Sequence, residues 1–277
     1  MKKYTALLLL LLVTTLTFGQ RKERLKGSKT VTVEQREIGE FTSVAVEDNI
    51  EIYLEKGTKN EIKIEADDNL HEIISLELRD KHLRIYTAKD ARIFKKLVVR
   101  ITYTKDLISV TAKHDASVFA IQELSLEDIT IQATDYAKLY LNVNSKKFAL
   151  IADDKTKTEL NLKSEQGSIQ LSKNADVKAL VSSTDFKCDL YQKATAAIEG
   201  EVTNGTIRLD NNSVFTGNKL TIKNVNLSAE NYTSCLIFAE ETIKISAADE
   251  AEIFLFGKAK VEITRFENEA KLFKKSK

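Results

Sequence analysis

Residues 135–174 read DYAKLYLNVNSKKFALIADDKTKTELNLKSEQGSIQLSKN, and this stretch decides the fold. It holds two near-copies of one unit, each opened by a short polar turn at Asp135 or Asp154. After the first turn, Leu139 and Leu141 alternate with residues of other kinds, which is the period of two typical of a β-strand with one buried face. The stretch therefore predicts short strands joined by tight polar turns.

The polar turn recurs at a nearly fixed interval along the chain. Its marker residues are Asp115, Asp135, Asp154, Asn174, Lys193, Asn212, Asn231, Asp249 and Asn268. Successive markers lie 20, 19, 20, 19, 19, 19, 18 and 19 residues apart. Such a repeat is the signature of a solenoid, in which each unit buries its apolar face only against its neighbours. We expect the markers at the corners, because Asp and Asn tolerate the left-handed backbone conformation.

Alternating apolar residues predict the core. Pairs or triplets expected to point inward are Ile50/Ile52/Leu54, Ile62/Ile64, Ile129/Ile131, Leu160/Leu162, Ile169/Leu171, Ile207/Leu209, Ile243/Ile245, Ile253/Leu255 and Val261/Ile263. Aromatic residues expected to thicken this core are Phe119, Phe148, Phe186, Phe215 and Phe238. The best helical candidate is 68–74, which Asp67 or Asp68 would cap.

Other β architectures fit the sequence less well. A hairpin-built sandwich favours tight turns such as Asn-Gly, and Asn204-Gly205 is the one match. A propeller repeat is about twice as long as this one. We therefore predict an all-β protein, a parallel β-helix of about 19–20 residues per coil. It would form one structural domain, with a looser N-terminal part at 20–106 and regular coils at 107–277.

The first twenty residues predict export. Lys2 and Lys3 precede the apolar run ALLLLLLV at 6–13, and small residues lead to cleavage after Gly19 or Gln20, which makes 1–19 a signal peptide. An uncleaved anchor helix is disfavoured, because the run is shorter than the roughly 20 residues of a membrane span. No later segment is apolar enough to be a transmembrane segment. The predicted location is the periplasm, the outer-membrane surface or the extracellular space.

The net charge and the two cysteines argue against nucleic-acid binding, a disulfide and a zinc site. Without Lys2 and Lys3 the formal charge falls from +1 to −1, so the chain lacks the basic surface typical of nucleic-acid binding. Cys188 and Cys235 belong to units two apart, and strand spacing of about 4.8 Å puts their sulfurs beyond disulfide range. We expect two free, mostly buried thiols, and no zinc site, because no CxxC or histidine cluster accompanies them.

A series of short motifs carries a resemblance to a known family. The motifs are Phe41-x-x-Val44-x-Val46, Asp48-Asn49-Ile50-Glu51-Ile52, Gly57, Ile62-x-Ile64-x-Ala66-Asp67-Asp68-Asn69-Leu70, Leu83-x-Ile85, Val99-x-Ile101 and Leu107. Over about residues 38–260 the chain resembles the GIN domain family of exported bacterial proteins, described as auto-transporter adhesin heads. The resemblance implies a right-handed parallel β-helix and an envelope or extracellular location, with no established chemistry. Family corners usually carry Gly-Ala or Gly-Ser, whereas this chain has, for example, His114-Asp115-Ala116-Ser117.

The sequence contains no recognisable set of catalytic residues. His71, His82 and His114 lie in separate segments without the partners of a Ser-His-Asp site, and surface or corner positions account for them. We therefore predict no catalytic, cofactor-binding or metal-ligating residue.

The corner acids support one alternative. Asp135, Asp154 and Asn174 would line up on successive coils beside Lys155, as in a calcium-assisted polysaccharide lyase. A solvated corner ladder is the favoured interpretation, because calcium needs more converging acids than these.

Two further groups bear on binding. Basic residues that fit either an anionic surface or a solvated, frayed end are Arg92, Lys95, Lys96, Lys271, Lys274, Lys275 and Lys277. With no Trp in the chain, sugar stacking would fall to tyrosines such as Tyr136, Tyr140 and Tyr232, of which the first and last are expected at one exposed edge.

Repetition without convergent reactive groups favours a non-enzymatic module over an enzyme. We expect an adhesin-like surface-binding or envelope scaffold protein whose partner is a glycan or another cell-surface component. The alternative is a β-helix polysaccharide lyase that uses Asp135, Asp154 and Lys155.

Overall fold

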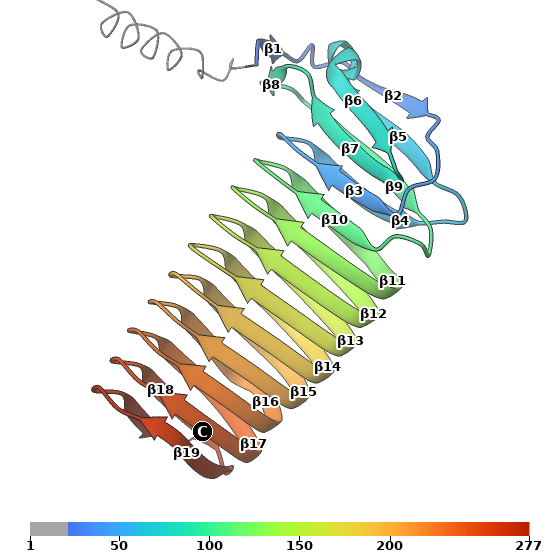
Figure 1. Ribbon diagram of the computed structural model, residues 1–277. Helices are drawn as coiled ribbons and strands as arrows, with labels where there is room; N and C mark the ends of the chain where they lie inside the picture. Colours follow the sequence, from blue (N-terminus) through green and yellow to red (C-terminus); the bar gives the residue numbers. More distant parts are fainter. Residues whose placement is uncertain (1–21, 277) are drawn as a thin grey trace, which may run out of the picture.

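The computed structural model of the protein describes residues 22–276. Its stacked parallel strands form a β-solenoid of about nine turns, which confirms the predicted fold class (Figure 1). The predicted signal peptide at 1–19 lies outside the described residues.

Each regular coil is one long strand followed by a tight corner. The coil strands are β11 (Ser117–Ala133), β12 (Lys138–Ala152), β13 (Lys157–Leu171), β14 (Asp176–Leu190), β15 (Thr195–Leu209), β16 (Val214–Ala229) and β17 (Ser234–Ala247). Neighbouring strands pair in parallel along both halves, so that Lys138 lies beside Lys157 and Ala152 beside Leu171.

Every long strand bends in the middle and so contributes to two sheets. In β12 the pairing runs to Ser145, omits Lys146 and resumes at Lys147. The burial pattern slips at the same place, because Lys146 and Lys147 are both exposed before the alternation resumes. We call the sheet formed by the first halves (138–145 in β12) face 1, and the sheet formed by the second halves (147–152) face 2.

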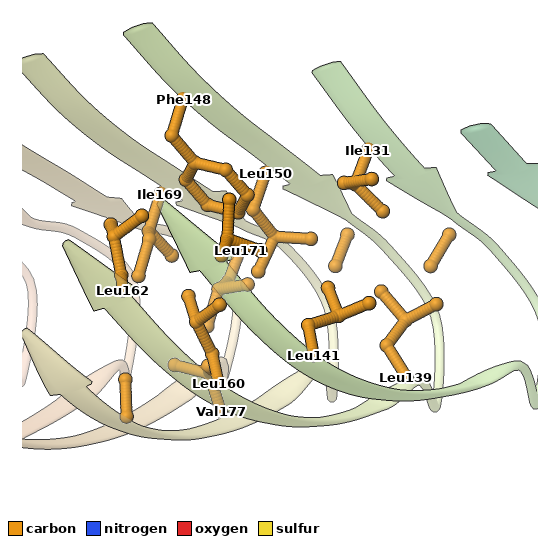
Figure 2. Packing of buried hydrophobic residues seen from close by; sticks show 14 of the residues in the cluster. Ile131, Leu139, Leu141, Phe148, Leu150, Leu160, Leu162, Ile169, Leu171 and Val177 are labelled. Carbon is orange, nitrogen blue, oxygen red and sulfur yellow. The ribbon is translucent and has the colours of Figure 1, made fainter. Parts of the chain in front are cut away.

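The core lies between the two faces. Figure 2 shows Leu139 and Leu160 from face 1, and Phe148, Leu150 and Ile169 from face 2, pointing into a common interior. None of the five is more than 4% exposed. Because burying one such side chain is worth about 1.5–3 kcal/mol, the repeated columns supply most of the stabilisation of the coils.

The predicted inward residues up to Leu255 are buried, which confirms the strand periodicity. The prediction is wrong for Phe119 and Phe238, which are half-buried on the outer surface. The smaller residues Val118 and Ala120 hold the inward positions on either side of Phe119. The buried Phe148, Phe186 and Phe215 follow the prediction.

The left-handed corners are confirmed at seven of the nine markers, for example at Asp135 (φ 63°) and Asn212 (φ 64°). In the coils of Asp115 and Asn174 the left-handed residue is instead the one before the marker, His114 or Lys173. The repeat therefore locates each corner to within one residue.

Successive corners hydrogen-bond to one another in two different directions. In the early coils the N–H points back along the rod, so that Asn174 N donates to Asp154 O at 2.8 Å. From the next corner onward the N–H points forward, and Lys193 N donates to Asn211 O at 3.0 Å. The corner peptide thus reverses between the coils of Asn174 and Lys193.

Ten shorter strands precede the long coil strands. They are β1 (Arg24–Lys26), β2 (Val31–Arg36), β3 (Ser43–Val46), β4 (Glu51–Lys56), β5 (Glu61–Asp67), β6 (Ile74–Arg79), β7 (His82–Thr87), β8 (Asp90–Arg92), β9 (Leu97–Tyr103) and β10 (Ser109–Ala112). Face 1 continues from β11 through β4 and β9 and ends in the antiparallel strands β5 and β2. Face 2 continues through β10, β3 and β7 and ends in antiparallel β6. We call residues 22–40 and 61–103 the N-terminal cap.

Asp67 holds the N-terminal cap together. Its buried carboxylate accepts the backbone N–H groups of Lys29 (2.8 Å), Lys95 (3.0 Å) and Lys96 (3.0 Å). Burial acts to raise the pKa of Asp67, but these donors outweigh it and the pKa lies below its ordinary value. Gly27 leaves room for the carboxylate, since an added Cβ would lie 2.3 Å from Asp67 Oδ2.

The helical candidate is a 3-10 helix, η2 (Asp68–Ile73). Asp67 occupies its N-cap position but makes no side-chain cap hydrogen bond. The predicted capping role of Asp67 is therefore wrong, because its carboxylate accepts hydrogen bonds from the backbone N–H groups of Lys29, Lys95 and Lys96 instead. Asp68 Oδ1 accepts the N–H of Asn69 at 2.7 Å.

The C-terminal end consists of β18 (Glu252–Gly257), β19 (Lys260–Phe266) and β20 (Lys271–Lys274). Val261 and Ile263 continue the inward columns of Ile243 and Ile245, as predicted from their register. They are nevertheless 40% and 51% exposed, so their predicted burial is wrong. Within residues 22–276, no further coil covers them.

Cys188 and Cys235 are free and buried, as predicted. Burial raises the pKa of both thiols far above the ordinary value. Cys188 lies in face 2 and Cys235 in face 1.

Candidate functional site

A shallow trough runs along face 2. One hollow of about 670 Å³ extends from Asp128 to Thr206, and a second of about 310 Å³ extends from Lys187 to Thr264. Both are lined by Lys187 and Thr206, so they form one continuous depression. We call this depression the face-2 trough. Its length over successive coils suits an extended ligand rather than a compact one.

The trough owes its depth to short outward side chains. Thr130, Ala149 and Ser168 follow one another in register along its floor. Because strands in a sheet lie about 4.8 Å apart, similar groups recur at that interval along the rod.

A hydrogen-bonded polar ladder follows the trough beside this floor. Asn204 donates to Asp185 Oδ1 (3.0 Å), Asn224 donates to Asn204 Oδ1 (3.3 Å), and Thr242 donates to Asn224 Oδ1 (2.8 Å). These side chains fix one another's orientation and leave further donors and acceptors for a ligand.

Asp189 is the most unusual group in the trough. It occupies an outward position between Gln170 and Arg208 on the neighbouring coils, yet it is only 6% exposed. Lys187 Nζ lies 2.7 Å from its Oδ2. Its Oδ1 is buried and has no hydrogen-bond partner within residues 22–276. Arg208 is directed elsewhere, with its guanidinium 5.6 Å from the centre of the Tyr191 ring.

A separate hollow, of about 870 Å³, lies along the bend between the faces. Its base includes Ser145, Ser164 and Ser183, which share a column with the larger Leu126 and Val202. The hydroxyls of Ser164 and Ser183 are 3.1 Å apart. The bend hollow is therefore polar and open, with a rim of mixed charge.

Face 1 carries an aromatic stack. The rings of Tyr53, Phe119 and Tyr140 lie on consecutive rungs, with centroids 4.7 Å and 4.9 Å apart and nearly parallel planes. Arg100 lies over Tyr53 at 5.0 Å. Because the rings stack on one another, their mutual faces are not available as a platform for sugars.

The corner residues of the lyase alternative do not converge. Asp135 Oδ2 accepts the N–H of His114 at 3.0 Å, whereas Asp154 Oδ1 pairs with Lys173 Nζ at 2.7 Å. Lys155 points its ammonium over the Tyr136 ring, 5.3 Å from the centroid. The acids thus have separate partners rather than one shared site.

Lys173 Nζ, which pairs with Asp154, also lies 2.8 Å from Asp153 Oδ2. Burial acts to raise the pKa of Asp153, but hydrogen bonds from Lys173 and Ser172 outweigh it and lower the pKa. In the described part of the chain, no group of three or more His, Cys, Asp or Glu side chains could hold a metal ion.

The three histidines have different partners. His82 Nδ1 bonds with Ser43 Oγ at 2.8 Å, and His114 is a left-handed corner residue. His71 differs from its predicted surface or corner position, because it is 9% exposed within the N-terminal cap. Its Nε2 lies 2.9 Å from Thr32 Oγ1.

The basic tail is not frayed. Lys271 and Lys274 belong to β20, which pairs in parallel with β18. Lys275 lies over the stacked rings of Phe254 and Phe273. Lys277 lies outside the described residues.

Arg92 pairs with Asp90, while Lys95 and Lys96 direct their backbone N–H groups to Asp67. These three residues therefore belong to the fold of the N-terminal cap.

Tyr136 and Tyr232 are exposed at the corners, at 54% and 61%, as predicted. Sequence reasoning missed Asp189 altogether. It stands between the inward Cys188 and Leu190, in the same phase as ordinary outward residues such as Gln170. Lys187, two residues earlier on the same strand, pairs with its carboxylate, and period-two alternation alone does not predict this pairing or the burial.

Most of the chain matches a known protein family. Residues 40–180 and 152–259 match the family described as "Putative auto-transporter adhesin, head GIN domain". No curated protein matches the chain. No helix within residues 22–276 is long and apolar enough to cross a membrane.

Solved structures from Parabacteroides share the fold. A "putative adhesin" from Parabacteroides merdae is 17% identical, with a TM-score of 0.64 over 91% of this chain and 100% of that one. A "putative adhesin" from Parabacteroides distasonis is 16% identical, with a TM-score of 0.66 over 90% and 99%. A "putative lipid binding protein" from the same species is 12% identical, with a TM-score of 0.66 over 91% and 100%. At these identities the likeness concerns the fold alone. Because the family match spans most of its length, the protein belongs to the GIN domain family.

Proposed function

We propose that this protein is an exported, non-enzymatic binding module that attaches to an extended component of a cell surface through its face-2 trough. The observation that carries the proposal is the continuity of the trough over successive coils. A ligand lying along the rod would meet similar polar groups at each rung, which suits a polymer.

The polar ladder supports the same proposal. Asp185, Asn204, Asn224 and Thr242 orient one another through hydrogen bonds, so a ligand need not order them. Preorganisation of this kind lowers the entropic cost of binding. The separate partners of Asp135 and Asp154 favour binding over catalysis at the corners.

The test compares amide ladders on the two faces. Fluorescently labelled protein is incubated with intact bacteria and with isolated envelope polysaccharide, and bound protein is measured. We expect saturable binding that falls at least several-fold in the double variant Asn204→Ala/Asn224→Ala.

The matched control is Asn142→Ala/Asn161→Ala, which removes an amide pair bonded at 3.1 Å on face 1. This control should bind like the parent protein. Absence of saturable binding by the parent, or steady release of cleaved polymer fragments, would contradict the proposal.

A further inference from the structure

We infer that Asp189 is a sugar-binding residue, whose carboxylate accepts a hydroxyl hydrogen of a glycan lying in the face-2 trough. This inference rests on the proposed function and names its ligand class and its central contact. Its basis is Asp189 Oδ1, a buried acceptor without a hydrogen-bond partner among residues 22–276.

The carboxylate of Asp189 is half satisfied. Lys187 Nζ neutralises it from 2.7 Å at Oδ2, while Oδ1 is buried with no partner among the described residues. An ionised oxygen removed from water without a hydrogen bond is costly, more so than a neutral polar atom. Such a group is explained when a ligand or an ordered water completes it.

The surroundings of Asp189 select the kind of ligand. Its part of the trough is also lined by Thr206, Asn226, Ser228 and Ser246, which both donate and accept hydrogen bonds. A few placed polar groups in a depression are typical of a ligand site. A hydroxyl-rich ligand can use all of these groups at once.

Charge argues against a simple cation. The ammonium of Lys187 already contacts the carboxylate, and Arg208 and Lys244 line the same hollow. A bound metal ion or amine would compete with the Lys187 ammonium for the same carboxylate. A sugar hydroxyl donates a hydrogen bond without adding charge and so avoids this competition.

Four hydroxyls among residues 22–276 are also buried without a hydrogen-bond partner, but none of them lines the trough. They belong to Ser145, Thr156, Thr158 and Thr233. Asp189 therefore differs from them in both charge and position.

The decisive variant is Asp189→Asn, which keeps the side-chain shape and removes the charge. Binding to soluble dextran, mannan and polygalacturonate is measured by titration calorimetry, so that neutral and acidic glycans are compared. We expect the parent protein to bind at least one of them and Asp189→Asn to bind at least tenfold more weakly. The melting temperature should not fall, because an incompletely bonded buried charge is removed.

Asp176→Asn is the matched control. Asp176 lies on the same strand but on face 1, where its Oδ1 accepts the hydroxyl of Thr195 at 2.6 Å. This variant should bind glycans like the parent. If Asp189→Asn does not fold, Asn226→Leu, an exposed change in the same hollow, should still weaken binding at least tenfold.

The outcomes separate the two proposals. Parent-like glycan binding by folded Asp189→Asn overturns the role of Asp189. Attachment to bacterial surfaces without binding to any glycan overturns the sugar assignment and leaves the proposed function standing. Failure to bind either surfaces or glycans overturns both.

Discussion

The two ends of the rod are finished in different ways. At the N-terminal end, antiparallel strands and η2 close both faces, and Leu70 and Ile73 of η2 are buried. At the C-terminal end, β19 is exposed along its whole length and leaves Val261 and Ile263 uncovered. The comparison shows that the last coil at each end needs a separate structure to cover its apolar residues, because every other coil is covered by its neighbours.

The two regions are also held by different forces. The coils depend on aliphatic columns, which do not titrate. The N-terminal cap depends on buried and half-buried charges, such as Asp67 with its three backbone donors and Glu65 with Lys96 and Arg100. Core substitutions should therefore damage the coils most, and loss of charge should damage the cap first.

The largest effect is expected from a charge in the coil core. Ile207→Asp should destabilise the rod by more than about 4 kcal/mol, because it buries an unpaired carboxylate. Arg208→Ala, one residue along and exposed, should change stability by less than about 0.5 kcal/mol. Chemical denaturation measures both, and equal tolerance at the two positions would refute the inward assignment.

The next comparison sets the open end against the coil before it. Ile245→Ala should cost about 2–5 kcal/mol, since it leaves a cavity in a buried column. Ile263→Ala, in the same column but 51% exposed, should cost less than about 1 kcal/mol. Thermal denaturation of both variants checks this. A large loss at Ile263 would mean that a partner covers this end in solution.

A smaller, local effect is expected in the N-terminal cap. Asp67→Ala leaves the N–H groups of Lys29, Lys95 and Lys96 without their acceptor, at a cost of about 1–3 kcal/mol. Hydrogen exchange should quicken in residues 22–40 and 90–97 and stay unchanged in residues 157–209. Uniform quickening along the rod would show that cap and coils unfold as one unit.

The mildest perturbation is acid. Hydrogen bonds from Lys96 and then Arg100 lower the pKa of Glu65 from 4.5 to about 2. Its folded pKa lies below that of the unfolded chain, so its stabilisation is complete above about pH 4.5 and is lost as the pH falls toward 2. Pepsin should therefore nick the N-terminal cap before the coils when the pH is lowered from 4.5 to 2.5.

A matched variant tests the source of this acid sensitivity. Glu65→Gln removes the titrating group, so cleavage of the cap should depend less on pH over the same interval. Cleavage that begins in the coils would contradict the greater acid sensitivity of the N-terminal cap.

The regular coils could be predicted because their information is local. Period-two alternation and the 18–20-residue interval identify inward columns and corners without knowledge of distant contacts. Phe119 was misplaced because a large aromatic residue favours burial in general, whereas here it stacks outside between Tyr53 and Tyr140.

The cap and the candidate site were beyond sequence reasoning because alternation does not reveal side-chain contacts. Asp67 reads as a helix cap in its own segment, but its partners lie 28 to 38 residues away. Asp189 reads as an ordinary outward residue, but it is only 6% exposed and pairs with Lys187. Alternation predicts which way a residue points and says nothing about what meets it there.

The reversal of the corner peptide has an electrostatic consequence. In a trans peptide the carbonyl points opposite to the N–H, so Lys173 C=O points forward along the rod and Gln192 C=O points back. Two oxygens of like partial charge therefore confront each other at that rung. Contact between those two coils rests on the pairing of their strands, because their corners lack the backbone hydrogen bond that joins the other successive corners from Asp135 to Asn268.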